Sequence, residues 1–385
     1  MPCILDIATA VPEFLVKNED FVKFYANALS AVDAGAVSKK LAFINWKAKI
    51  DHRYSCVPDF NGLIQELFTD GDYVQTVEKR LELYREKIMP LATDAIDKVL
   101  SQANIEPGGI THIITVTCTG LFSPGFELLI AEHYGMQKTE KFAINFLGCY
   151  AAMKAIKLAN YIAQSDPAAC VLIVSAELCT LHFYPSVSDE DIVANLLFAD
   201  GAAAMIICGN ESSYIKNKIV LNIDAIGSAL IPGTMDLMTW NIASSAFRMF
   251  LSKDIVKAIK ENIRPVVHGF LQESGADADY WAIHPGGVRI VEAVRESLGL
   301  TESNVADSMS VLQQYGNMSS PTILFILSSI FNKIRKEEHA ENKRIFSCAF
   351  GPGLSIEMIG LSSIDTTPVR KIKQTINAIN YAVQA

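Results

Sequence analysis

The sequence of 385 residues lacks the patterns that would place it in several common protein classes. Its eight cysteines form no CxxC pair and no cysteine and histidine cluster with zinc spacing, so no metal centre is expected. No apolar run reaches the roughly 18 residues that cross a bilayer, and the opening MPCILDIATAVPE has no cationic stretch typical of a signal peptide. We therefore expect a cytoplasmic protein without a membrane span, whose cysteines are reduced thiols.

Positive charge is also scarce. The chain has 33 Lys and Arg against 42 Asp and Glu, a net charge of −9, which argues against nucleic-acid binding because phosphates need a basic face. An anionic ligand must therefore bind at a local basic cluster, and the segment KKLAFINWKAKI at 39–50 supplies one. Half of the residues are apolar and only 19% are charged, which is typical of a globular protein with a large core.

Short apolar segments alternate with helical patterns, which predicts an α/β fold with parallel sheets. In the first half, buried strands are expected at 3–8, 112–118, 141–147, 170–175 and 202–208. From about residue 218 a similar series follows: VLNIDAIG, a helix over roughly 246–272, WAIHP, helices from about 287 and 320, RIFSCAF and LSIEMIGL. We predict two tandem α/β halves, residues 1–215 and 216–362, that share one packed unit, and a tail over 363–385.

The tail predicts an amphipathic helix. Most such helices dock on their own domain, and binding to a partner or to a membrane surface is the alternative. The apolar stripe consists of Ile372, Ile376, Ile379 and Val383, and the basic first turn of Arg370, Lys371 and Lys373.

Three short motifs contain residues suited to catalysis: LGCYAA with Cys149, WAIHPGG with His284 and QQYGNMSSP with Asn317. Taken singly, each has a structural explanation, because a cysteine packs in a core and HPGG or Gly-Asn can form a turn. Each motif, however, follows a predicted strand or loop and directly precedes a helical segment. Parallel α/β folds concentrate ligand sites at the carboxyl ends of strands, so we expect the three side chains to meet at one site.

The three residue types fit carbon–carbon bond formation between thioesters. A thiolate exchanges readily with a thioester, and a helix N-terminus and a neighbouring imidazolium are both expected to lower the pKa of the Cys149 thiol. The Asn317 amide and a His284 N–H can stabilise a thioester oxygen as negative charge develops there, by roughly 3 kcal/mol per donor. A malonyl thioester held in this way loses CO₂ without a general base, and the enolate attacks the acyl group on Cys149.

The contexts of these residues resemble the chalcone synthase-like type III polyketide synthases of the thiolase superfamily. AFGPGLSIE at 349–357 is similar to the GFGPG loop of that family and NLLFADGAAA at 195–204 to its LFGDGAAA segment, so motifs match from about residue 3 to 361. The resemblance implies a five-layered αβαβα fold, a homodimer, and no metal or prosthetic cofactor. It also implies that a starter acyl-CoA loads on Cys149, that malonyl-CoA extends it repeatedly, and that the product cyclises to a pyrone, a resorcinol or a phloroglucinol.

The resemblance assigns further roles residue by residue. Phe198 matches a gatekeeping phenylalanine between the CoA tunnel and the cavity, and Gly353 lies in a stretch that either shapes the cavity wall or forms a tight turn. Lys40 and Lys47 match positions that contact the CoA phosphates. Phe43 stands where the family has an arginine between them, and lysines on an amphipathic helix are also commonly just solvated.

Several cavity positions differ from the plant enzymes of this family. Cys118, His182, Trp240 and Met249 replace two threonines, a glycine and a second gatekeeping phenylalanine, whereas Ser319 matches. These replacements disfavour chalcone as the product, and Cys118 and Trp240 resemble bacterial members. We therefore expect an aliphatic acyl-CoA, or malonyl-CoA alone, as the starter.

Three other functions use part of the same pattern. A β-ketoacyl-ACP synthase III-like enzyme shares the cysteine, histidine and asparagine but performs one condensation, with malonyl from a carrier protein; the GPG loop and NLLFADG disfavour it. A hydroxymethylglutaryl-CoA synthase needs a glutamate that the matching motif lacks. A non-catalytic scaffold with a thiolase fold would not need all three catalytic residue types.

Overall fold

The computed structural model describes residues 1–29, 34–62, 64–274 and 278–367. The amphipathic stripe predicted between residues 370 and 383 lies outside the described residues. None of the described helices is long and apolar enough to cross a membrane.

The strands expected in the first half all form, and they lie side by side in the order β5-β4-β6-β7-β1. Pairing is parallel between β4 and β5 and between β4 and β6, but β7 is antiparallel to both β6 and β1. The sheet is therefore mixed, and the prediction of purely parallel layers is wrong. The strands are β1 (Cys3–Ala10), β4 (His112–Thr117), β5 (Glu140–Asn145), β6 (Cys170–Leu178) and β7 (Asp200–Cys208).

The second half repeats this arrangement with four strands in the order β11-β12-β13-β8. Only β11 and β12 are parallel. The two halves are continuous through β1 and β8, which pair only where Cys3 and Ile4 face Asn222 and Leu221, so the two sheets join at one end. The strands are β8 (Ile219–Leu230), β11 (Tyr280–Ile283), β12 (Arg344–Gly351) and β13 (Ser355–Asp365). Residues 363–365, expected in the tail, thus belong to β13.

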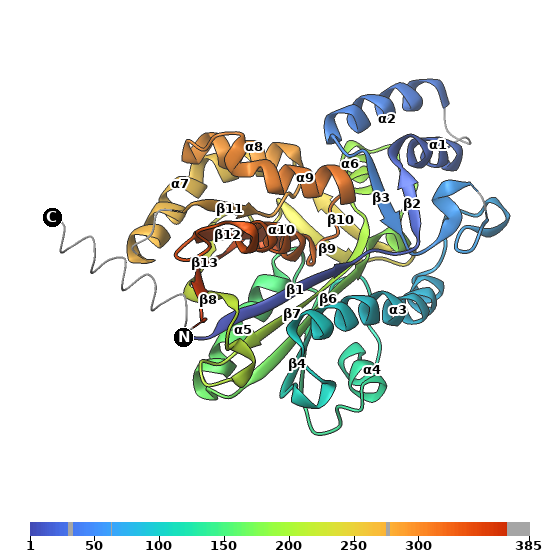
Figure 1. Cartoon of the computed structure of the whole chain (residues 1–385). Helices are drawn as coiled ribbons and strands as arrows, with labels where there is room; N and C mark the ends of the chain where they lie inside the picture. Colours follow the sequence, from blue (N-terminus) through green and yellow to red (C-terminus); the bar gives the residue numbers. More distant parts are fainter. Residues whose placement is uncertain (30–33, 63, 275–277, 368–385) are drawn as a thin grey trace, which may run out of the picture.

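The helices and strands stack in five layers, as the family resemblance implied: two outer helical layers, two sheets and a helical layer between the sheets. Helices α3 (Val77–Ala103) and α4 (Phe126–His133) cover the outer face of the first sheet, and α7 (Ile255–Ser274) and α8 (Val288–Leu298) cover the outer face of the second. Between the sheets lie α5 (Ala151–Ser165) and α10 (Thr322–Lys336), whose core contains side chains from both sheets. Figure 1 shows α3 and α4 on one side of the molecule and α7 and α8 on the other.

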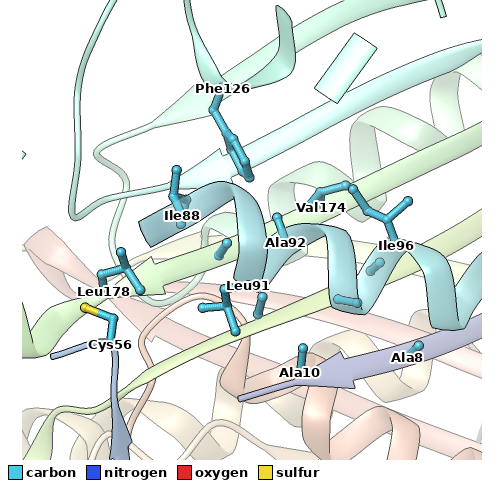
Figure 2. Close-up of a cluster of buried hydrophobic side chains, with 14 of the residues drawn as sticks. Ala8, Ala10, Cys56, Ile88, Leu91, Ala92, Ile96, Phe126, Val174 and Leu178 are labelled. Atoms are coloured by element: carbon cyan, nitrogen blue, oxygen red, sulfur yellow. The ribbon is translucent and has the colours of Figure 1, made fainter. Parts of the chain in front are cut away.

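The side chains explain these layers. The strands β6 and β7 are buried along their whole length, because helices cover both of their faces. Figure 2 shows how Ile88, Leu91 and Ile96 of α3 lie over the strands at Val174 and Leu178. Helix α10, with the apolar run TILFILSSIF, is buried on nearly all sides, which suits a helix between two sheets.

One predicted helix begins later than expected. The segment assigned to a helix from residue 246 first forms β10 (Phe247–Leu251), which pairs with β9 (Met238–Ile242), and α7 begins only at Ile255. In β10, Phe247 and Met249 are buried while Arg248 and Phe250 are exposed. This period of two, typical of a strand, was hidden in the sequence by the strong helical pattern that follows it.

The remaining elements cover the end of the sandwich where the helices of the middle layer begin. Helix α2, which contains the predicted basic segment, contacts α6, and α9 contacts α10. These elements are α1 (Asn18–Ala28), α2 (Ala34–Ala48), α6 (Asp189–Leu197), α9 (Ala306–Tyr315), β2 (Phe14–Lys17) and β3 (His52–Ser55).

Candidate active site

Cys149 lies in a tight loop between the end of β5 and the first turn of α5. Two residues of this loop have left-handed backbones, Phe146 with φ 63° and Gly148 with φ 80°. A Cβ atom at Gly148 would lie 2.6 Å from Cδ of Pro352, so only glycine fits there. The loop thus holds the thiol at the N-terminus of a buried helix, as the sequence predicted.

Cys149 is only 6% exposed. Its Sγ lies 4.0 Å from Nδ2 of Asn317. Burial raises the pKa of the thiol to about 11, although hydrogen bonds from Ser319 and Asn317 oppose this increase. The prediction of a lowered thiol pKa is therefore wrong for the substrate-free site, because loss of water outweighs the helix N-terminus.

His284 follows β11, and its backbone N–H donates to the carbonyl of Cys348 at 2.9 Å. The imidazole is 1% exposed, and neither Nδ1 nor Nε2 has a hydrogen-bond partner among the described residues. Burial lowers the pKa of His284 to about 3, so the ring is neutral at pH 7. A buried polar group without a partner is costly, which favours a role in which a ligand completes its hydrogen bonds.

The strand that leads to His284 is connected to the helix that follows Cys149. Met153, in the first turns of α5, accepts a hydrogen bond from Ser347 of β12 at 3.8 Å. Ser347 pairs with Ala282 of β11, two residues before His284. The α5 N-terminus and the end of β11 are therefore separated by one strand.

Asn317 lies in the loop between α9 and α10. Its backbone N–H donates to Leu197 at 3.0 Å and its carbonyl accepts from Ala199 at 2.9 Å, so the loop is anchored on both sides of Phe198. Its Oδ1 accepts the backbone N–H of Ser319 at 2.8 Å. The Oδ1 bond assigns the amide orientation and leaves Nδ2 as the donor that faces the thiol.

A buried carboxyl that the sequence analysis did not single out ties these loops together. Glu177 accepts hydrogen bonds from the Cys118 backbone N–H at 2.8 Å, from the Thr119 hydroxyl at 2.7 Å and from the Ser320 hydroxyl at 2.5 Å. Burial raises the pKa of Glu177, and these hydrogen bonds oppose the increase. The only sequence signal was an acidic residue inside the otherwise apolar strand CVLIVSAEL.

One cavity brings together six residues that the sequence analysis assigned to the gate and the cavity. Gly148 and Ser319, which lie next to Cys149 and close to Asn317 in the chain, also line it, whereas Cys149, His284 and Asn317 are buried and are not among its lining residues. Phe21, Phe183 and Arg248, which the sequence analysis did not name, also line it. The six expected residues are Cys118, His182, Phe198, Trp240, Met249 and Ser319.

Backbone hydrogen bonds fix the two large side chains of the cavity wall. His182 contacts the Thr119 carbonyl through Nε2 at 2.7 Å and accepts the Phe247 N–H at Nδ1 at 3.0 Å, which fixes its tautomer. Its ring stacks on Phe247 with centroids 4.3 Å apart, and burial lowers its pKa to about 3. Trp240 donates from Nε1 to the Cys118 carbonyl at 2.8 Å.

Three other expected site residues lie away from the described cavity. Gly353 is in the turn between β12 and β13 with φ 69°, which favours its interpretation as a turn residue. Lys40 forms an ion pair with Asp189 and donates to the Val187 carbonyl at 2.7 Å. Lys47 lies over the Phe43 ring, with Nζ 4.2 Å from its centroid.

The five-layered sandwich, with a cysteine before one central helix and an asparagine before the other, defines a thiolase-like condensing enzyme. Two family profiles match the chain: chalcone and stilbene synthases, N-terminal domain, over residues 1–211, and the C-terminal domain of the same synthases over residues 222–365. The chain belongs to this family and is a type III polyketide synthase.

Individual relatives agree with this assignment. The chain is 30% identical over 321 residues to Polyketide synthase 37 of Dictyostelium discoideum, a match that spans 81% of this chain but only 11% of that protein. It is 26% identical over 377 residues to Type III polyketide synthase A of Arabidopsis thaliana, covering 94% of this chain and 93% of the relative. The crystal structure of PKS-I from the brown alga Ectocarpus siliculosus superposes with a TM-score of 0.87 at 30% identity, covering 94% and 98% of the two chains.

Proposed function

We propose that this synthase loads a starter acyl group from an acyl-CoA onto Cys149 and extends it repeatedly with malonyl-CoA. The observation that supports this proposal best is the 4.0 Å contact between the Asn317 amide and the Cys149 sulfur. A cavity lined by six of the expected gate and cavity residues also includes Gly148 and Ser319, which are close to these two residues in the chain. The His284 imidazole, whose nitrogens have no hydrogen-bond partner among the residues that the structure describes, supplies the third group.

Loading begins from two neutral groups, since the pKa of the thiol is about 11 and that of the imidazole about 3. In our proposal His284 takes the proton of Cys149 as sulfur attacks the thioester carbonyl. The C–S bond to CoA then breaks, and the departing CoA thiolate takes the proton from His284. The products are an acyl-Cys149 thioester and free CoA.

Extension uses the same groups as hydrogen-bond donors. The thioester oxygen of malonyl-CoA binds between the Asn317 amide and a His284 N–H, the carboxylate leaves as CO₂, and its bonding electrons form an enolate. The enolate carbon attacks the acyl carbonyl, and the Cys149 thiolate leaves and is reprotonated through His284. Because neither imidazole nitrogen has a hydrogen-bond partner in the described part of the chain, the ring can change tautomer and serve both steps, unlike His182.

This reaction needs no metal or prosthetic group, because the thioester itself accepts the electrons released on decarboxylation. We infer an aliphatic acyl-CoA, or malonyl-CoA alone, as the starter, since Trp240 and His182 occupy part of the cavity. Release as a pyrone, a resorcinol or a phloroglucinol depends on how the chain folds inside that cavity.

The proposal is tested by incubating the enzyme with malonyl-CoA and an acyl-CoA series of increasing chain length, with and without EDTA. Mass spectrometry is expected to show an acyl group on Cys149 and lactones or phenols that contain several malonyl-derived units, unchanged by the chelator. Single-extension β-keto acids would instead support the β-ketoacyl-ACP synthase III-like alternative. Absence of acylation with every thioester would support a scaffold.

We propose that Lys47 binds a phosphate group of CoA. Lys40 is already paired with Asp189, whereas Nζ of Lys47 lies over the exposed Phe43 ring and has no ion pair within the described residues. A Lys47→Met substitution is expected to raise KM for malonyl-CoA several-fold without changing kcat, because it removes binding far from the reacting atoms. An unchanged KM would contradict this role, and Lys39→Met serves as the control for surface charge.

We infer a homodimer that forms through β5. This strand is the edge of the sheet, and its side chains are largely exposed, including Phe142 at 39%. An open edge strand with an exposed aromatic residue is suited to pairing with a second copy of the same strand.

We also propose that the protein works in the reducing cytoplasm. All eight cysteines are free thiols, including Cys170 and Cys208, whose sulfur atoms are 3.9 Å apart on neighbouring strands. Immunofluorescence or fractionation in the source cell tests this location, and recovery with a secreted fraction would contradict it.

A further inference from the structure

Arg53 of β3 is fully buried, and its described hydrogen-bond partners are uncharged. Its guanidinium donates to the carbonyls of Leu196 at 2.7 Å, Phe198 at 2.9 Å and Asn195 at 3.1 Å, and to Oδ1 of Asn18 at 2.7 Å. The guanidinium carbon also lies 4.3 Å from the centroid of the Phe21 ring, which lines the cavity. A buried charge with this many contacts to one short segment is unusual for simple packing.

The segment it contacts is the C-terminal end of α6, where a helix leaves carbonyl groups without helical partners. The end of a helix also carries partial negative charge, which a cation stabilises. Arginine suits this position better than lysine, because its planar fork can donate to several carbonyls at once. Arg53 therefore fixes the path of the chain where α6 ends and Phe198 follows.

The same segment holds the catalytic asparagine. The backbone of Asn317 bonds to Leu197 and Ala199, on either side of Phe198. On the asparagine loop, a Cβ atom at Gly316 would lie 3.8 Å from Cβ of Arg53. One guanidinium thus supports the gatekeeping ring and, through two backbone hydrogen bonds, the amide that faces Cys149.

We propose that Arg53 is a positioning residue that couples decarboxylation of malonyl-CoA to condensation. This inference rests on the proposed function. Asn317 must hold the enolate at the distance from which it attacks the acyl-Cys149 thioester, and Phe198 must close the cavity beside it. If the end of α6 shifts, CO₂ is still released, but the enolate is protonated by water instead of forming a carbon–carbon bond. Loading of the starter onto Cys149 does not depend on the contact between Arg53 and the end of α6.

The test measures CO₂ released per malonyl unit incorporated into product, together with acylation of Cys149 by the starter. Arg53→Lys keeps the charge but loses the fork, and Asn18→Ala removes one acceptor and leaves the guanidinium less constrained. Both variants are expected to acylate normally. The CO₂ released per incorporated unit is expected to rise up to about tenfold in Arg53→Lys and less in Asn18→Ala, because small displacements of reacting groups strongly reduce rate.

Arg335→Met is the matched control. Arg335 is a partly buried arginine that bonds to Asp6 and Leu5 and lies over the Phe331 ring, away from the cavity. Its loss is expected to lower the melting temperature without changing the ratio of CO₂ to product.

Three results decide the matter. Folded Arg53→Lys and Asn18→Ala proteins with the wild-type ratio would overturn the inference, as would an equal rise in Arg335→Met. If Arg53→Lys does not fold, Asn18→Ala alone decides, because it leaves the arginine in place. A wild-type enzyme that never acylates Cys149 would refute the proposed function itself, which the acylation assay distinguishes from a failure of coupling.

Discussion

At the scale of single residues, burial sets the protonation states of the candidate site more strongly than the neighbouring charges do. The Cys149 thiol and the His284 imidazole are both neutral at pH 7, because water is excluded from both. In the proposed mechanism, the thiolate forms only as the sulfur attacks a bound thioester. This arrangement protects a reactive thiol from oxidation between cycles.

In the proposed mechanism, loading needs the Cys149 thiol, whereas decarboxylation needs only the Asn317 and His284 donors. Cys149→Ala is expected to abolish acylation but to retain part of the CO₂ release from malonyl-CoA, because the Asn317 amide and His284 survive. Asn317→Ala should lower decarboxylation by about 10²-fold, the usual effect of losing one oxyanion donor, and His284→Ala should lower it as well. Radiometric release of CO₂ and mass spectrometry of Cys149 measure the two steps. Equal loss of both activities in Cys149→Ala would contradict this separation.

His182 makes the stability of the fold depend on pH. Its pKa is lowered to about 3 in the folded state, whereas the unfolded chain has the usual value near 6.5. As the pH falls below 6.5, His182 is protonated in the unfolded state but stays neutral in the folded state. The free energy of unfolding therefore decreases at acid pH. Well above pH 6.5, His182 is neutral in both states and this loss of stability disappears.

A His182→Gln variant, which keeps an amide donor and acceptor, isolates this effect. From pH 7.5 to pH 5.5 the wild type is expected to lose about 1.4 kcal/mol more free energy of unfolding than the variant. Urea unfolding at both pH values measures the difference. The comparison is made against the variant because Asp200, whose pKa burial raises to about 6, contributes in the opposite direction in both proteins. Parallel pH profiles would refute the prediction.

At the scale of elements, the hairpin of β9 and β10 carries the cavity positions that the family resemblance assigned one by one. Its residues Trp240, Phe247 and Met249 line the cavity. Sequence reasoning found the two replaced positions but assigned residues 246–272 to one helix, because the strand pattern of β10 covers only five residues. The major strands were predicted well, since buried β6 and β7 leave long β-branched and apolar runs.

We expect the hairpin to limit the length of the growing chain, because its side chains line the cavity. Trp240→Gly is expected to enlarge the cavity and to shift products toward at least one further malonyl-derived unit or a longer starter, because the indole fills space beside Cys118 and His182. Liquid chromatography with mass spectrometry compares the product masses of variant and wild type. Trp46→Ala, at a residue 75% exposed on α2, is the control. Identical product masses from a folded Trp240→Gly enzyme would show that another element sets the chain length.

At the scale of the whole molecule, the edge of the large sheet formed by β5 has largely exposed side chains. If β5 pairs with its copy, the edge is closed and Phe142 is covered. Light scattering after size exclusion is expected to give the mass of a dimer for the wild type and of a monomer for Phe142→Asp. Phe250→Asp, at a residue of similar exposure on β10, should stay dimeric. A monomeric wild type would contradict the inferred dimer.

The sequence alone predicted the layered fold, which the structure confirms, and proposed a nucleophile with two partners. Cys149, His284 and Asn317 each stand beside glycines and helix starts that leave a local signature, and the buried strands leave an apolar one. Only the tertiary structure decided the direction of the thiol pKa, the roles of Glu177 and Arg53 and the hairpin that forms the cavity wall. These depend on exclusion of water and on contacts between residues up to about 150 positions apart, such as Arg53 and Phe198, which no local pattern records.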